Sequence, residues 1–369
     1  HMEREAWSLA AKLHTKASQK DDAVRCQIKA AETYVKIADL AEAAEKPSYM
    51  HICSWLQSAV EAYRLIPNAQ VRRDELYGRL VQAQPRIREE MQSFSTEIDV
   101  TDIAKRAREE VTDTDKFNSL QKFAFLLRPP RLDDIRKQMD DRETNAPLAS
   151  MLAASFHDRK GRVVAKTSGD DPEEVKMHRH VAQYHRNFYA KAALWPAMIQ
   201  IRNDHDVSLD EWISFLQDHP FVPKERILAY AHGLFHGFHG DYLSAAHVLI
   251  PQIENSIRHV LNQFARETSR QIEGGLQEES SLNFTLNCPE LIEIFGENLV
   301  FDLKGLLVEK VGENLRNQLS HGLLDDDQMF SPEMVYLYWL TLFIIFLPTK
   351  QLQHEQPEVA DTAEVVADA

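Results

Sequence analysis

The sequence predicts a mostly α-helical protein, and two observations carry this expectation. The 369 residues include only 12 glycines and 15 prolines, so tight turns are few, which favours helices joined by short loops. Apolar residues also return every three or four positions through most of the chain, which is the period of a helix. A chain of this length exceeds one compact core, so we expect two or three domains.

Residues 3–140 are predicted to form an N-terminal all-helical domain. Helical periodicity is clear in "AAETYVKIADLAEAAEK" and "WLQSAVEAYRLI". The strings AAETY and SAVEAY are loosely alike, as in tetratricopeptide-style helix pairs, although the diagnostic Trp, Gly and Pro positions of that repeat are missing. Pro129 and Pro130 interrupt any helix there and indicate a nearby domain boundary.

Residues 141–219 differ in character and are predicted to form a middle segment. A turn at Asp158–Gly161 is followed by β-branched Val163 and Val164, which predicts one small β-hairpin. The stretch "PEEVKMHRHVAQYHRNFYAKAALWPAMIQI" then predicts a long helix with Pro172 in its first turn.

This long helix contains the most basic and aromatic stretch of the chain. Arg179, His185 and Arg186 are candidates for contact with an RNA strand, through charge and stacking. The alternative is a solvated helix face with aromatic residues packed beneath it, which is the commoner role of such a run.

Residues 220–349 are predicted to form a second helical domain. Its last helix contains the most apolar run, "MVYLYWLTLFIIFL", which is shorter than the roughly 20 residues that cross a bilayer and is followed by Pro348. We therefore expect a buried core helix, suited also to a subunit interface, and no membrane partner. Residues 350–369 are acidic and poor in large apolar side chains, which predicts a disordered tail.

Charge and cysteine usage narrow the functional class. The formal net charge of −15 argues against a general binder of polyanions, but it leaves room for a small basic pocket. Cys26, Cys53 and Cys288 are scattered, so neither a disulfide framework nor a thiolate zinc site is indicated, and a reducing cytoplasm fits.

The stretch "ENLRNQLSHGLL" from Glu313 to Leu324 is the most informative part of the sequence. Continued from "LLVEKVG" as one helix, it would place an apolar stripe on the core side, formed by Val308, Val311, Leu315 and Leu319. The opposite side would carry Asn314, Asn317 and His321, with Ser320 nearby. Arg316 and His321 would lie about 140° apart, at the two rims of this polar face. They could converge only if the last turn distorts, which Gly322 permits as a left-handed cap, or if a second subunit supplies a copy.

These side chains suit one metal-free phosphoryl reaction. His can move a proton near neutral pH, Arg matches phosphate oxygens, and Asn can orient either group. Together they could promote attack of a ribose 2′-hydroxyl on its own 3′-phosphate, which cleaves RNA and leaves a 2′,3′-cyclic phosphate. The alternative is structural: Arg316 pairs with Glu313 or another acid, and His321 is a cation at a helix C-terminus.

The string "RNQLSHG" resembles the Arg-Asn-x-x-x-His signature of the HEPN superfamily, the higher eukaryote and prokaryote nucleotide-binding domains. More narrowly, it is similar to an uncharacterised helical family marked by Arg-Asn-x-x-x-His-Gly, which includes eukaryotic proteins linked to RNA degradation at the endoplasmic reticulum membrane. The segment "GDYLSAAHVLIPQIENSIRHVL" is similar to the helix that precedes the motif in that family. The resemblance covers Pro220 to Thr349 and extends to the hairpin "FHDRKGRVVAKT".

The resemblance implies a bundle of four or five helices that dimerises, with the motif helices of two subunits forming one ribonuclease site. By position, Arg316 would bind phosphate, His321 would transfer the proton, and Asn317 is the polar residue after the Arg. Many HEPN proteins are toxins, defence nucleases or binding modules. Around this site we expect a supporting shell of Asn314, Ser320, Glu254 and Arg258.

Glu254 and Arg258 have two readings, because they are spaced as a helical ion pair. They could form a simple surface pair, or they could support Arg316 or His321 from the preceding helix. His232 and His236 are also one turn apart, but the glycines beside them disfavour a rigid metal site, so no metal and no other cofactor is expected.

The sequence therefore predicts a metal-independent endoribonuclease that acts on RNA as a homodimer through its C-terminal bundle, in a defence or toxin role. The alternative is a HEPN-like module that binds a nucleotide or a protein and cleaves nothing, which the acidic net charge favours. From domain order alone, the N-terminal helices are expected to sense a trigger or bind a regulatory partner.

Overall fold

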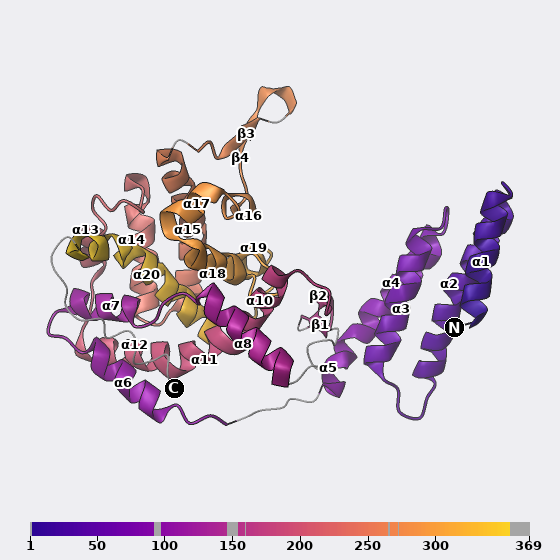
Figure 1. The fold of residues 1–369 in the computed structure, drawn as a ribbon, viewed down its shortest axis with the longest axis horizontal. Helices are drawn as coiled ribbons and strands as arrows, with labels where there is room; N and C mark the ends of the chain where they lie inside the picture. Colours follow the sequence, from indigo (N-terminus) through magenta and orange to yellow (C-terminus); the bar gives the residue numbers. More distant parts are fainter. Residues whose placement is uncertain are drawn as a thin grey trace. The chain divides into compact units, whose positions relative to one another are not determined.

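A computed structural model describes residues 2–91, 97–145, 154–158, 160–264, 266–271 and 273–354. The protein is mostly helical, as predicted (Figure 1). It divides into two compact units: unit 1 contains residues 1–97 and 153–167, and unit 2 contains residues 98–152 and 168–369. The division differs from the predicted domain limits, because position 140 lies inside unit 2 and the predicted middle segment is split between the two units.

Unit 1 is built on four helices that pack in chain order: α1 (Met2–Lys16), α2 (Lys20–Glu42), α3 (Tyr49–Arg64) and α4 (Gln70–Ala83) (Figure 1). A 3₁₀ turn, Gln84–Arg86, then leads into the short α5 (Ile87–Glu90). Apolar side chains from successive helices meet in the core, among them Val35, Ile52, Leu56, Leu76, Leu80 and Ile87. The helical period read from the sequence places these residues on the buried faces.

The predicted hairpin is present and belongs to unit 1. Strand β1 (Ala154–His157) pairs antiparallel with β2 (Val163–Thr167). At the turn, the Asp158 carboxylate accepts hydrogen bonds from the backbone N–H groups of Lys160 and Arg162, both at 2.9 Å. Gly161 has a left-handed φ of +74°, and a Cβ there would lie 1.9 Å from the carbonyl oxygen of Gln84. The glycine therefore lets the turn approach the segment that follows α4.

Unit 2 contains most of the helices. The first group is α6 (Thr101–Val111), α7 (Lys116–Phe125), α8 (Leu132–Asn145), α10 (Glu173–Val181), α11 (Asn187–Tyr189), α12 (Trp195–Asp204) and α13 (Leu209–Phe215). The second group is α14 (Ile227–Phe238), α15 (Tyr242–Gln263), α16 (Leu282–Thr285), α17 (Pro289–Phe295), α18 (Glu297–Leu307), α19 (Leu315–Ser320) and α20 (Pro332–His354). Two π-helical stretches, Ala182–Arg186 and Ala190–Leu194, join α10 to α12, so the predicted long helix is continuous but irregular.

A second hairpin in unit 2 was not predicted. Strands β3 (Ser269–Gln271) and β4 (Gln277–Glu279) pair antiparallel, where the sequence predicted no strand. Gly274 and Gly275 at its tip have φ values of +84° and +78°. Adjacent glycines between two short polar strands permit such a turn, but neither strand has an apolar face that would indicate it.

Helix α20 is a buried core helix, as predicted. Its indole and phenol groups hydrogen-bond to neighbouring helices: Trp339 Nε1 donates to the Ala124 carbonyl at 3.1 Å, and the Tyr338 hydroxyl donates to the Leu234 carbonyl at 2.9 Å. The helix continues through Pro348 to His354, so residues 350–354 of the predicted disordered tail are helical. Among the helices of the described residues, none is long and apolar enough to cross a membrane. Residues 355–369 of the predicted tail lie outside the described part of the chain.

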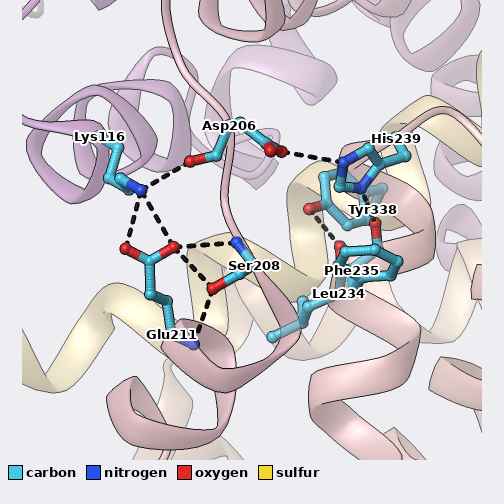
Figure 2. A network of polar contacts seen from close by, with 8 residues as sticks. All are labelled: Lys116, Asp206, Ser208, Glu211, Leu234, Phe235, His239 and Tyr338. Carbon is cyan, nitrogen blue, oxygen red and sulfur yellow. Dashed lines mark hydrogen bonds and ion pairs between the residues drawn. The ribbon is translucent and has the colours of Figure 1, made fainter.

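Polar contacts join α7, α13 and α14 around the loop that precedes α13. Figure 2 shows the Lys116 ammonium between the Asp206 carbonyl, at 2.7 Å, and the Glu211 carboxylate, at 2.8 Å. Ser208 and Glu211 form a capping box that begins α13. On the other side of the loop, the Asp206 carboxylate lies 3.1 Å from His239 Nε2 (Figure 2). These contacts fix the α12–α13 connection beside α14.

Candidate functional site

The motif helix is shorter than predicted because a non-helical segment separates it from the preceding helix. Helix α18 ends at Leu307 and α19 begins at Leu315, so the predicted single helix is wrong, although Val308, Val311 and Leu315 are buried as predicted. The intervening segment folds back on α18: the Glu313 N–H donates to the Gly305 carbonyl at 3.2 Å. A Cβ on Gly312 would lie 2.1 Å from that same oxygen, so only glycine permits this approach.

Asn314 marks the start of α19. Its φ of +52° and ψ of +34° place it in the left-handed region, which asparagine tolerates better than most residues. Its side-chain oxygen accepts a hydrogen bond from Asn317 Nδ2 at 2.6 Å. The carbonyl of Glu313 accepts a further bond from Gln318 Nε2 at 2.6 Å. Side chains one turn apart thus hold this six-residue helix to the residues that precede it.

Arg316 is half-buried, with 31% of its side chain exposed, and is oriented by two neighbours. Its Nε donates to Glu254 Oε2 at 3.1 Å. Its Nη1 lies 3.4 Å from Asn317 Oδ1. The guanidinium is therefore fixed on its Nε side, while part of it reaches the surface of unit 2.

Glu254 is the centre of this arrangement. One carboxylate oxygen binds Arg316 and the other accepts from Arg258 Nη1 at 3.0 Å. Only 13% of the Glu254 side chain and 18% of the Arg258 side chain is exposed. The two residues form an ion pair along α15 that is largely buried rather than on the surface, and Glu254 also contacts Arg316.

His321 and Ser320 lie at the other end of α19. Both are exposed, and His321 is the residue at which the helix ends. Gly322 follows with a φ of +60°, the left-handed conformation expected after a helix terminus. Within the described residues no polar contact of the His321 ring is found, and His321 does not line the cavity next to Arg316. One chain by itself thus leaves Arg316 and His321 without a shared contact.

A cavity of about 450 Å³ opens next to Arg316 and Arg258. Its other lining residues come from Glu254, from the region of the β3–β4 hairpin and from the start of α16: Glu267, Ser269, Glu278, Glu279, Ser280, Ser281 and Phe284. Four glutamates and two arginines give this lining a formal charge of −2. Glu267, Glu278 and Glu279 lie 37 or more positions before Arg316 in the sequence, so no local pattern connects them with the motif.

Arg186 is buried, which contradicts its predicted role as an RNA contact. None of its side chain is exposed, and its guanidinium lies among the carboxylates of Asp302 and Glu313. Arg186 Nε donates to Asp302 Oδ1 at 2.9 Å, Nη1 donates to Glu313, and the Tyr336 hydroxyl donates to Asp302 Oδ2 at 2.9 Å. A Cβ on Gly305 would lie 2.5 Å from Arg186 Nη2, so that glycine makes room for the guanidinium.

This buried cluster reaches the motif through Glu313, which directly precedes Asn314. Burial raises the pKa of Glu313 to about 6, although the nearby Arg186 charge opposes the rise. Burial likewise raises the pKa of Asp302, against the effect of Arg186. Neither acid could be recognised from the sequence as a partner of Arg186, because the contacts join residues more than 100 positions apart.

The other two predicted RNA contacts have different outcomes. The His185 ring is tilted against the Tyr189 ring with centroids 4.6 Å apart, and its Nδ1 is buried without a hydrogen bond. Burial, aided by the Arg186 charge, lowers the pKa of His185 to about 3, so a neutral ring replaces the expected cation. Arg179 is half-buried on α10. Arg186 and the His185 Nδ1 are thus interior groups, whereas the RNA contact of Arg179 stays a prediction.

The histidines near the end of α14 make separate contacts. The His232 and His236 rings are stacked with centroids 6.3 Å apart. His236 Nδ1 lies 3.0 Å from Asp241 Oδ2, and His239 pairs with Asp206. Among the described residues, no three His, Cys, Asp or Glu side chains are grouped so that they could hold a metal ion.

The structure therefore brings together Asn314, Arg316, Asn317, Glu254 and Arg258, and leaves Ser320 and His321 at the exposed end of the same short helix. The chain matches no protein-family model, and no curated protein or solved structure is significantly similar to it.

Proposed function

We propose that this protein is a metal-independent endoribonuclease that acts as a homodimer, with Arg316 and His321 as its catalytic groups. The observation that supports the proposal most is the fixed Arg316 guanidinium, held by the shared carboxylate of Glu254 and reaching a cavity. Arginine in such a place is suited to a phosphodiester, because its remaining N–H groups can donate to phosphate oxygens.

The proposed reaction needs no group beyond those of the protein and the RNA. The ribose 2′-hydroxyl attacks the adjacent phosphorus, a histidine takes the hydroxyl proton, and the bond to the 5′-oxygen of the next nucleotide breaks. The leaving oxygen receives a proton from an imidazolium. Arg316 stabilises the extra negative charge on the phosphoryl oxygens, and the products are a 2′,3′-cyclic phosphate and a 5′-hydroxyl.

A dimer is part of the proposal because one chain holds Arg316 and His321 apart. Arg316 faces the cavity, whereas His321 lies past the end of α19 on the exposed surface. A second copy of α19 could supply the missing partner to each group. The exposed apolar Leu323, two positions after His321, suits a contact with another chain.

Incubation of a dye-labelled single-stranded RNA with the full chain and excess chelator tests the activity. We expect cleavage to continue with chelator and to fall by about 10²-fold to 10⁴-fold in His321→Ala, the usual worth of a proton-transfer group. His247→Ala is the matched control, because His247 is an exposed histidine on α15 that does not line the cavity. Equal cleavage by wild type and His321→Ala, or loss of cleavage with chelator, contradicts the mechanism.

Mixing two inactive variants tests the shared site. Arg316→Ala and His321→Ala chains each lack one group, and a mixed dimer holds one intact Arg316 opposite one intact His321. If the site draws these groups from different chains, the mixture regains part of the activity. If both groups act within one chain, the mixture stays inactive, although sedimentation shows that mixed dimers form.

A non-catalytic binding module is the second candidate, and the acidic cavity lining favours it. Its formal charge of −2 would attract a cationic segment of a partner rather than a nucleic-acid backbone. Tight association with an RNA that stays intact for hours, or association with a basic partner and none with RNA, would support this candidate over the nuclease.

A further inference from the structure

Arg258 lines two neighbouring cavities, or hollows, of unit 2. The cavity next to Arg316 is one of them, and the other is a hollow of about 340 Å³. The second is lined by Pro223, Glu225, Arg226, Asn255, Arg258, His259, Asn262 and Glu279. Arg258 and Glu279 are the two residues that line both. A ligand that extends from one hollow to the other must therefore pass these two side chains.

Three arginines along this path are suited to phosphate groups. Arg316, Arg258 and Arg226 follow one another from the first hollow to the second. Asn255 and Asn262 of α15 supply amide groups beside them, and His259 supplies an imidazole. Spaced guanidinium and amide donors are the groups with which proteins bind a nucleic-acid backbone without reading its bases.

Glu279 of β4 occupies the middle of this path. Its Oε2 lies 3.7 Å from Arg258 Nε, which forms an ion pair. The same carboxylate oxygen is 3.4 Å from the hydroxyl of Thr268, a buried residue that also donates to Asn262 Oδ1 at 3.1 Å. Arg258 Nη1 in addition lies 3.5 Å from the Ser280 carbonyl. The hairpin thus places its own oxygen atoms where a phosphate would meet Arg258.

The hairpin changes the formal charge that the cavity lining presents to an anion. With Glu267, Glu278 and Glu279 in place, the lining of the first cavity has a formal charge of −2. Without the two hairpin residues Glu278 and Glu279, the carboxylates of Glu254 and Glu267 balance Arg258 and Arg316, and the formal charge becomes 0. The same site would therefore repel a phosphate less strongly with the hairpin displaced than with the hairpin closed.

We propose that Arg258 is a phosphate-binding subsite for the RNA strand next to Arg316, and that hairpin β3–β4 is a gate whose Glu279 competes with the strand for Arg258. This inference rests on the proposed function, because it takes RNA as the ligand. Binding exchanges the Glu279–Arg258 ion pair for a phosphate–Arg258 pair and moves no covalent bond. The Glu279 side chain is 64% exposed, so breaking its ion pair with Arg258 costs little free energy.

Affinity for a labelled 12-nucleotide single-stranded RNA, measured by fluorescence anisotropy at low salt, tests the gate. All variants carry His321→Ala so that the RNA stays intact. We expect Glu279→Gln to bind about twofold to fivefold more tightly, since exposed ion pairs are worth up to about 1 kcal/mol. Glu267→Gln is the matched control: it removes the same charge from the same cavity, but that carboxylate binds Ser269 rather than Arg258.

A double-mutant cycle locates the effect at Arg258. Arg258→Gln should weaken binding, and adding Glu279→Gln to it should then change the affinity no more than Glu267→Gln does. Circular dichroism of each variant confirms that the helices are retained. Equal gains from Glu279→Gln and Glu267→Gln, or a gain from Glu279→Gln that persists without Arg258, would overturn the gate.

The binding test of the Arg258 subsite can succeed or fail independently of the proposed RNA cleavage. If no variant with an intact His321 cleaves RNA, but Glu279→Gln still tightens binding through Arg258, the subsite stands and the cleavage proposal fails. If wild type cleaves RNA as proposed and Glu279→Gln leaves the affinity unchanged, the gate fails and the nuclease stands.

Discussion

Arg186 and Glu313 are 127 positions apart in the sequence and form an ion pair in the interior of unit 2. The pair connects the irregular helix between α10 and α12 with the residue that precedes Asn314 and α19. Because Glu313 also accepts from Gln318 through its carbonyl, a buried charge pair is joined directly to the first turn of the motif helix. The position of Arg316 thus depends on a side chain that itself has no access to solvent.

Replacement of Arg186 by methionine is expected to destabilise unit 2 by roughly 3–5 kcal/mol, because it leaves Asp302 and Glu313 buried without a counter-charge. Urea unfolding, followed by the fluorescence of the buried Trp212 and Trp339, measures the change. Lys191→Met is the control, since this exposed residue lies in the adjoining π-helical stretch and should shift stability by no more than about 0.5 kcal/mol. Similar unfolding curves for both variants would show that the buried pair contributes little.

His178 is expected to make unit 2 less stable in mild acid. The residue is 1% exposed and stacks on Phe301 with centroids 3.9 Å apart. Burial, together with the Arg186 charge, lowers its pKa to about 4, while Glu174 acts in the opposite direction. The folded state therefore binds the proton less tightly than the unfolded state. The contribution of the neutral His178 ring to the free energy of unfolding is therefore complete above pH 6.5. This contribution, about 3 kcal/mol at most, is lost as the pH falls toward 4.

His178→Phe isolates this effect, because it keeps the ring stack and removes the titrating group. Between pH 6.5 and pH 4 the wild type should lose up to about 1.4 kcal/mol more per pH unit than the variant, which corresponds to one proton. The comparison uses the difference between the two profiles of stability against pH, because Glu313 contributes in the opposite direction. Its pKa is raised in the folded state, so protonation of Glu313 below pH 6 stabilises the fold. Parallel profiles for the two proteins would mean that His178 is not held neutral by the fold.

Gly312→Ala should disturb the motif helix directly. The new methyl group would lie 2.1 Å from the Gly305 oxygen and 2.9 Å from its carbonyl carbon, and backbone atoms cannot rotate away as a side chain can. We expect a loss of roughly 1–3 kcal/mol in unit 2, as for other overpacked sites, and faster amide hydrogen exchange in α19.

Gly78→Ala is the contrasting substitution. Gly78 lies inside α4, and a Cβ there has no neighbouring atom within 4 Å. Alanine should stabilise unit 1 by about 0.5–1 kcal/mol, through its higher helix propensity. Thermal unfolding monitored by circular dichroism compares the two variants. If both glycines tolerate alanine equally, the close approach of Gly312 to α18 is not required.

Local features were predictable from the sequence where one short stretch contains the whole cause. The β1–β2 hairpin follows from the Asp158–Gly161 turn and the β-branched residues after it. The burial of α20 follows from an apolar run without a polar face. The end of the motif helix follows from Gly322, and the ion pair of Glu254 with Arg258 follows from their helical spacing. Each of these depends on one continuous stretch of the chain, from a single helical turn to one helix or hairpin.

Other features were not predictable because their causes lie far apart in the chain. The polar residues from Arg179 to Arg186 resemble a solvated or RNA-binding face, yet Asp302 and Glu313 turn Arg186 into a buried charge. The non-helical segment between α18 and α19 depends on the close approach of Gly312 to Gly305. Helical periodicity in the sequence contains no information on that contact. The limits of units 1 and 2 differ from the predicted domains for the same reason, since residues 98–140 pack with unit 2.

The sequence alone determined the helical class, the first hairpin, the buried last helix and the side chains of the candidate site, because backbone propensity and apolar periodicity act over a few residues. Tertiary structure decided that Glu254 is shared by two arginines, that Glu279 lies over one of them, and that Arg186 is an internal ion rather than a surface one. Charge partners are chosen by distance in space, and the Coulomb energy between two groups is independent of their separation along the chain.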